Sequence, residues 1–152
     1  MIKKNLIKIL ILLFFLSGCG YTPIFSKKNS NFSIYELSAS GNNKLNKIIN
    51  SKLNNYKDLD SPKKFSLIIE TYLNKKISSK DSKGNPKSYR INLVSDISIK
   101  DSNGIVKNKS FSKSIDYKNR SSKSDLKKYE NEISKNLAEK ISAEIIIYLE
   151  SI

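Results

Sequence analysis

Residues 89–100 read YRINLVSDISIK, and this stretch decides the fold. Its odd-numbered positions are mostly apolar, whereas its even-numbered positions carry mostly charged, serine and asparagine side chains. A period of two with one polar face is typical of an antiparallel strand that is buried on one side. Residues 65–73, FSLIIETYL, repeat the same odd-numbered pattern. We therefore expect a sheet with one apolar and one polar face.

Turn sequences divide this region into three strands. Residues 81–86, DSKGNP, and residues 101–104, DSNG, combine the aspartate, asparagine, glycine and proline that favour tight turns. The predicted strands cover residues 64–79, 87–100 and 105–117, and the short connections join them as a meander.

The third predicted strand has lysines on its apolar side. Its even positions are mostly serine and asparagine, and its odd positions are Ile105, Lys107, Lys109, Phe111, Lys113, Ile115 and Tyr117. Inward-pointing lysines protect an edge strand against pairing with other chains. A β-bulge that resets the register would give the same pattern. The sequence leaves both explanations open.

Two amphipathic segments flank the meander. In residues 43–59 the apolar side chains recur at helical spacing, and residues 60–62, DSP, are a stop signal. The second helix is predicted from an N-cap at Ser122, with Asp125 near the positive end of the helix dipole, to near Ile152. Its last turns are apolar nearly all round, which indicates deep burial or a partner surface. The two predicted stripes are Leu45, Ile48, Ile49, Leu53 and Tyr56, and Leu126, Tyr129, Ile133, Leu137, Ile141, Ile145, Tyr148 and Leu149.

Residues 32–37, FSIYEL, alternate loosely and are predicted as a strand before the first helix. The order of elements is then strand, helix, three strands, helix. Each helix has one apolar stripe and the sheet has one apolar face. We therefore expect an α+β two-layer sandwich, in which both helices cover one face of a four-stranded, mostly antiparallel sheet. A single domain over residues 32–152 accommodates these elements.

The N-terminus has the order of an export signal. Lysines at positions 3, 4 and 8 flank or enter an apolar run over residues 6–16, and small residues follow. The run is shorter than the about 20 residues that span a bilayer core. A buried helix or a short anchor is the alternative interpretation.

Residues 16–19, LSGC, resemble the lipobox of bacterial lipoproteins, and Cys19 is the one cysteine of the chain. The resemblance implies that a signal peptide of residues 1–18 is removed. It also implies that the Cys19 sulfur carries a diacylglycerol and that its freed amine carries an acyl chain such as palmitate. Residues 19–31 would then form a lipidated tether, and the anchoring would be effectively permanent.

The chain is strongly basic, with a net charge of +14. The excess is concentrated in residues 63–123, which contain 15 Lys and Arg against 5 Asp and Glu. A solvated surface in a lysine-rich proteome would explain this excess without any function. The alternative is a binding surface around the first hairpin loop, whose candidate residues are Lys75, Lys76, Lys80, Lys83, Lys87 and Arg90.

Catalytic and metal-binding patterns are missing from the sequence. The chain has no histidine, and lipidation of Cys19 would remove its thiol. The close acid pairs at positions 58 and 60 and at 130 and 132 are expected to be solvated. We therefore expect a binding protein rather than an enzyme, with no metal and no cofactor besides the lipid on Cys19. Export also argues against nucleic acid as the partner of the basic region.

Residues 19–25, CGYTPIF, resemble the mature N-terminus of alphaproteobacterial lipoproteins of the LPS-assembly family (LptE). In that family Cys-Gly-aromatic-x-Pro-aliphatic-aromatic is typical, and the predicted order of strands and helices is similar as well. The resemblance implies an outer-membrane, lipid-anchored protein that faces the periplasm. It implies a place inside the lumen of an LptD-type β-barrel and a role in loading lipopolysaccharide into the outer leaflet. Gly20 is compatible with outer-membrane sorting.

Lipopolysaccharide carries phosphates and acidic sugars, which the six candidate basic residues would meet through charge-assisted contacts. An adaptor subunit of another cell-envelope complex would share every feature except the residue 19–25 pattern, and it remains the alternative.

Overall fold

The computed structural model describes residues 30–152. The predicted signal peptide, Cys19 and nearly all of the predicted tether lie outside the described residues.

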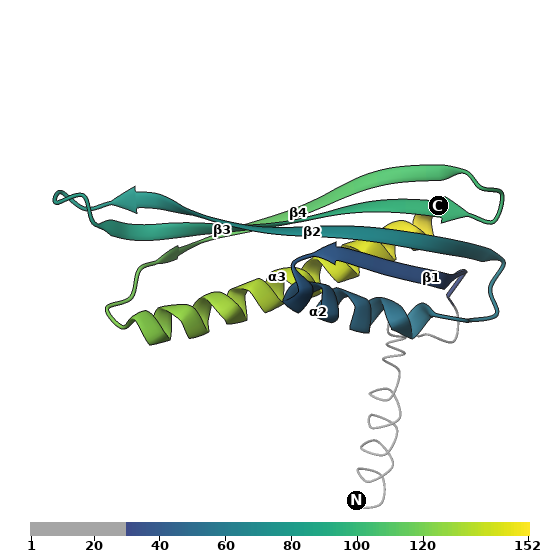
Figure 1. Ribbon diagram of the computed structural model, residues 1–152, viewed down its shortest axis with the longest axis horizontal. Coiled ribbons are helices and arrows are strands. Elements are labelled where there is room, and N and C mark those ends of the chain that lie inside the picture. The colour runs from purple at the N-terminus through teal and green to yellow at the C-terminus, as the bar shows by residue number, and fades with distance from the viewer. Residues whose placement is uncertain (1–29) are drawn as a thin grey trace, which may run out of the picture.

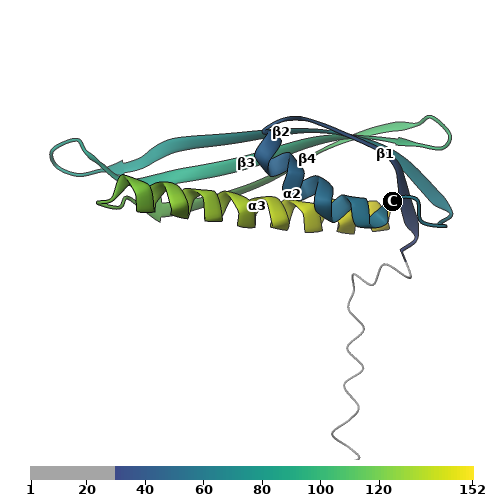
Figure 2. The same cartoon turned by 60° about the horizontal axis from the view of Figure 1, so that its bottom comes forward.

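The described chain forms a four-stranded sheet covered by two helices. In the sheet order β1-β2-β3-β4, β1 is parallel to β2 and the other neighbours are antiparallel. Figures 1 and 2 show both long helices beneath the same face of the sheet. The predicted α+β two-layer sandwich is therefore confirmed. Its elements are β1 (Phe32–Gly41), α2 (Asn43–Leu53), the 3-10 helix η2 (Asn54–Tyr56), β2 (Lys63–Lys80), β3 (Pro86–Asp101), β4 (Val106–Lys118) and α3 (Lys123–Ser151).

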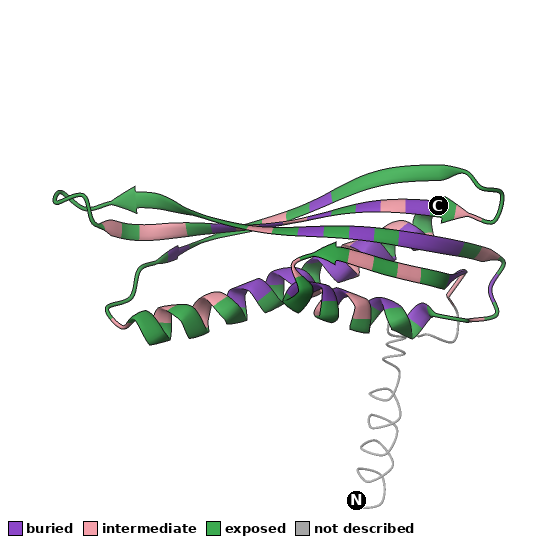
Figure 3. Ribbon diagram, in the orientation of Figure 1, coloured by how far each residue is buried: buried purple, intermediate pink, exposed green. Residues whose placement is uncertain are grey.

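The core lies between the sheet and the helices, as the alternation predicts. Leu67 and Ile69 of β2 and Leu93 of β3 are fully buried, and so are Ile141 and Ile145 of α3. Figure 3 shows buried and exposed residues alternating along the middle of the sheet. The even-numbered residues of β2, β3 and β4 point to the other face of the sheet, where most are exposed or half-buried.

A tight crossover connects β1 to α2. Gly41 ends β1 with a φ of 88°, a left-handed conformation that favours glycine. The Asn42 amide then donates to the Thr71 carbonyl at 2.9 Å, and the Asn42 side chain caps α2 by accepting from the Leu45 amide at 3.2 Å. These bonds fasten the start of α2 to the middle of β2.

The first helix ends earlier than the prediction of residues 43–59. The chain tightens into η2 directly after Leu53, and Lys57 then lies beside Ile34 as an isolated bridge. Asp58 has a φ of 54°, which a continuing helix does not allow. The apolar spacing continued to Tyr56, so periodicity alone placed the end too late.

β4 is an edge strand with lysines on the same side as its buried Phe111 and Tyr117. β4 pairs with β3 without any register shift, so the bulge explanation is wrong for this pairing. The Lys113 ammonium forms an ion pair with Glu144 of α3, and the Lys109 ammonium lies 5.5 Å from the centre of the Tyr148 ring. The long lysine side chains thus lie over the helix layer and keep their charged ends near solvent.

Candidate functional site: a basic hairpin

The strands β2 and β3 extend past the core at one end of the molecule. No side chain is buried between residues 74 and 90, although both strands stay paired to the turn. Figures 1 and 2 show this hairpin projecting beyond the first turn of α3. We call residues 74–90 the basic hairpin, because all six candidate basic residues belong to it.

A network around Asp81 fixes the hairpin turn. One Asp81 carboxylate oxygen accepts the amides of Lys83 at 2.9 Å and Asn85 at 2.8 Å. These bonds, foremost that from Asn85, lower the pKa of Asp81. Gly84 has a φ of 85° and open space around its Cα. The turn is therefore ordered by its own aspartate and glycine, which leaves its lysines facing solvent.

Lys76 and Arg90 lie side by side on the open face of the sheet. They are direct cross-strand partners, and Asp116 of β4 is the next residue in the same row. The Arg90 guanidinium donates to both Asp116 carboxylate oxygens, at 3.0 and 2.5 Å, and Ser78 donates to the same carboxylate at 2.7 Å. The Arg90 bond is the main cause that lowers the pKa of Asp116. Arg90 is thus held by a bidentate ion pair.

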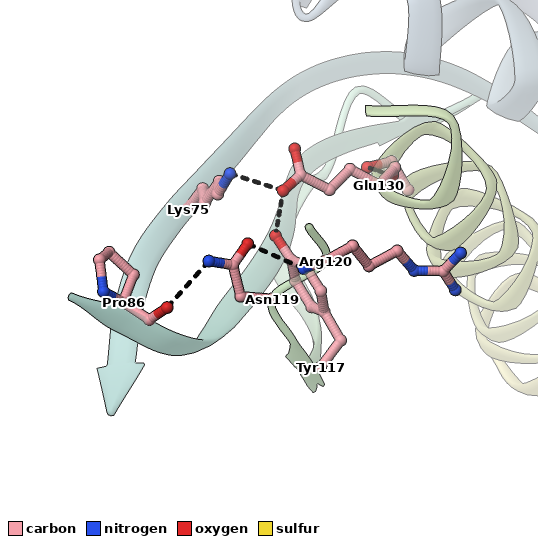
Figure 4. A network of polar contacts seen from close by, with 7 residues as sticks. Lys75, Pro86, Tyr117, Asn119, Arg120 and Glu130 are labelled. Atoms are coloured by element: carbon pink, nitrogen blue, oxygen red, sulfur yellow. Dashed lines mark hydrogen bonds and ion pairs between the residues drawn. The ribbon is translucent and has the colours of Figure 1, made fainter. Parts of the chain in front are cut away.

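Lys75 points to the opposite face, toward α3 (Figure 4). Its ammonium lies 2.5 Å from a Glu130 carboxylate oxygen and 4.1 Å from the centre of the Tyr89 ring. The Tyr117 hydroxyl donates to the same Glu130 oxygen at 2.7 Å. Burial and this bond raise the pKa of Tyr117. Lys75 therefore fastens the hairpin to α3 rather than facing a ligand.

The end of β4 and the connection to α3 add two basic residues that sequence reasoning missed. Lys118 is the cross-strand partner of Ser88, and the Arg120 guanidinium lies 4.0 Å from the centre of the Tyr129 ring. The Asn119 side-chain amide donates to the Pro86 carbonyl at 2.9 Å, as Figure 4 shows. Because β4 runs antiparallel to β3, its end lies beside the basic hairpin. The predicted meander already implied this position.

The structure therefore divides the six predicted residues. Lys75 and Arg90 have acidic partners, and Lys76 lies beside the Arg90–Asp116 pair. The side-chain ammonium groups of Lys80, Lys83 and Lys87 make no ion pair or hydrogen bond with any residue from 30 to 152. Lys118, at the end of β4, is likewise absent from the ion pairs of the described residues.

The described part of the chain shows no cluster of three or more metal-ligating side chains. Among residues 30–152, no helix has both the length and the apolar character needed to cross a bilayer.

No protein-family model matches the sequence, and no curated protein matches it significantly. Solved structures do match the fold. Rare lipoprotein B from Shewanella oneidensis has a TM-score of 0.62 and 19% identity, with 78% of this chain and 95% of that chain covered. A minor lipoprotein from Acinetobacter baumannii has a TM-score of 0.59 and 11% identity, with 81% and 92% covered.

The chain has the fold of bacterial lipoproteins. Lipoprotein B from Nitrosomonas europaea matches as well, with a TM-score of 0.55 and 10% identity over 78% of this chain and 84% of that chain. One fold therefore recurs in lipoproteins of three organisms. At such low identity the likeness concerns the fold alone.

Proposed function

We propose that this protein is an outer-membrane lipoprotein that partners an LptD-type β-barrel and assists the insertion of lipopolysaccharide into the outer leaflet. Lipidation at Cys19 anchors it, and the domain faces the periplasm and the barrel lumen. The basic hairpin binds the phosphates and acidic sugars of lipopolysaccharide. The observation that carries this proposal is the exposed positive charge of the hairpin, on a fold shared with bacterial lipoproteins.

The length of the domain supports this arrangement. Ser30, where the described chain begins, accepts a hydrogen bond from Ser61 of the loop before β2, at the end of the sheet opposite to the hairpin. The 18 residues of β2 span about 60 Å at about 3.3 Å per residue. A bilayer with its headgroups is about 40–45 Å thick. A domain held at the Ser30 end by the inner leaflet is thus long enough for its hairpin to reach the outer leaflet.

The open face of the sheet supports a polar surrounding. Short polar side chains dominate the exposed rows, in which Asn74, Asn92 and Ser114 are neighbours across three strands. The lumen of an outer-membrane barrel is polar, and such side chains can hydrogen-bond within it.

Copurification tests the partner. The membrane-extracted protein, carrying its lipid, should retain a large β-barrel protein whose identification by mass spectrometry gives an LptD-type sequence. Retention of a different envelope complex would instead support the adaptor alternative and overturn the barrel assignment.

A charge-matched pair of variants tests the lipopolysaccharide site. The triple variant Lys80→Gln, Lys83→Gln and Lys87→Gln should bind lipopolysaccharide much more weakly than the native protein. The control triple, Lys47→Gln, Lys52→Gln and Lys140→Gln, removes the same charge from exposed helix positions outside the contacts with the hairpin and should bind normally. Equal binding by both variants would remove the hairpin as the site. Neutralising all six candidates should add little beyond the triple, since Lys75 and Arg90 are already paired.

A further inference from the structure

The end of the sheet opposite to the basic hairpin presents an exposed apolar tip. Ile105, in the connection between β3 and β4, and Val106, the first residue of β4, are 56% and 54% exposed. Lys64 and Lys107 line a shallow depression together with Ile105, and Lys100 is the cross-strand partner of Val106. We call these five residues the β3–β4 tip.

The turn that presents this tip is ordered from within. One Asp101 carboxylate oxygen accepts the amides of Asn103 and Ile105, both at 2.9 Å. The Gly104 amide donates to the Asp101 carbonyl at 3.1 Å, with a φ of 82° at Gly104. The acidic residue of the turn is therefore used to shape it, and the lysines around the apolar pair face solvent.

The described chain begins beside this tip. The Ser61 hydroxyl donates to the Ser30 carbonyl at 2.9 Å, and the next residue, Pro62, lines the same depression as Ile105. The predicted lipidation site, Cys19, lies 11 residues before Ser30 in the sequence. That length of chain spans at most about 36–40 Å. Any membrane that holds the Cys19 lipid is therefore within reach of the β3–β4 tip.

We propose that the β3–β4 tip is a second membrane contact, in which Ile105 and Val106 enter the headgroup region of the bilayer. Lys64, Lys100 and Lys107 meet the phosphates of anionic lipids around them. Apolar side chains inside a rim of lysines have the composition that binds such interfaces, through apolar burial plus electrostatic attraction. The contact orients the anchored domain with its basic hairpin away from the leaflet that holds the anchor. It rests on the proposed lipidation of Cys19, but it goes beyond the proposed function because it requires neither a barrel nor lipopolysaccharide.

A single tryptophan reports on this contact, since the chain contains none. Ile105→Trp and, as a matched control, Ile77→Trp in the basic hairpin both replace exposed isoleucines, at opposite ends of the sheet. The full, lipidated chain is reconstituted in vesicles of phosphatidylethanolamine and phosphatidylglycerol with brominated acyl chains. Bromine should quench the tryptophan at position 105 strongly and the one at position 77 little. Equal quenching of the two, no quenching at position 105, or failure of the protein to float with the vesicles would overturn the proposal.

The lysines are tested in the Ile105→Trp background. Lys64→Gln, Lys100→Gln and Lys107→Gln should each weaken the tip contact about fivefold on anionic vesicles, seen as a smaller quenched fraction. Replacing Lys127, Lys128 and Lys135 of α3 instead should leave the quenching unchanged. An equal effect of both sets would show only a general attraction of the basic chain and would overturn the assigned site. The vesicles contain neither lipopolysaccharide nor a barrel, so these results test the tip separately from those two parts of the proposed function.

Discussion

At the residue scale, position 41 has no room for a side chain. A Cβ there would lie 2.3 Å from the Thr71 carbonyl oxygen, and that oxygen is fixed by its bond to the Asn42 amide. Gly41→Ala should therefore lower the free energy of unfolding by about 3 kcal/mol or more, measured by urea titration. Gly84→Ala is the control, since it has a similar positive φ but open space, and should cost about 1–2 kcal/mol. Equal costs would show that conformation alone, not the contact, requires glycine at position 41.

The raised pKa of Tyr117 makes the free energy of unfolding depend on pH in the alkaline range. Burial, and second the bond to Glu130, hold its pKa above the ordinary value of 10.0. The unfolded chain loses this proton above about pH 10 and the folded chain keeps it. The stability that it contributes is therefore complete below about pH 10 and falls as the pH rises further. Above about pH 10 the unfolding free energy of the native protein should fall more steeply than that of Tyr117→Phe. Parallel falls in the two proteins would contradict the assignment.

At the scale of the elements, the lysines of β4 should keep the sheet from self-association. Replacing Lys109 and Lys113 by isoleucine removes the charge from the middle of the edge strand and leaves that part apolar, which is an aggregation hazard. The double variant should remain folded by circular dichroism but elute as a dimer or larger species in size-exclusion chromatography. Isoleucines at Lys127 and Lys128, exposed on α3 and away from the edge, are the matched control and should leave the protein monomeric. A monomeric edge variant would show that the lysines serve only their contacts with α3.

The strands and helices could be predicted from sequence wherever one face is buried throughout. The three predicted meander strands end within about two residues of β2, β3 and β4, since turn residues interrupt the alternation on both sides. The loose alternation of β1 has its cause in a register shift at Tyr35, which no local pattern signals. The end of α2 was predicted too late because Tyr56 continues the apolar spacing; it is buried in η2, where it stacks on Phe32.

The position of the candidate site could be predicted from the sequence, but the ion-pair partners of its basic residues could not. The distribution of charge along the chain located the basic hairpin, because two strands joined by a short turn lie side by side in the sheet. The partners of Lys75 and Arg90 are 55 and 26 residues away, on α3 and β4, and only the pairing register brings them close. A count of basic residues therefore overstated the charge available to a ligand.

At the scale of the whole molecule, the core and the basic hairpin are separable. Burial ends near Leu73 and Ile91, so the hairpin stays ordered through strand pairing and a few contacts with α3. Replacing residues 78–88 by Asn-Gly would close the strands after the Ile77 and Tyr89 pair with a two-residue turn that favours hairpins. The shorter connection should change the unfolding free energy by no more than about 1 kcal/mol, since closure entropy varies slowly with loop length.

The same replacement removes Lys80, Lys83 and Lys87 together, so lipopolysaccharide binding should be lost while folding persists. Vesicle contact at the β3–β4 tip, measured with Ile105→Trp, should stay at its native level because that tip lies at the other end of the sheet. Loss of both activities at once would mean that the two ends do not act independently, and unchanged lipopolysaccharide binding would move the site off the hairpin. Retention of the tip contact with loss of lipopolysaccharide binding is the result expected of a rod-shaped domain with a membrane-facing end and a ligand-facing end.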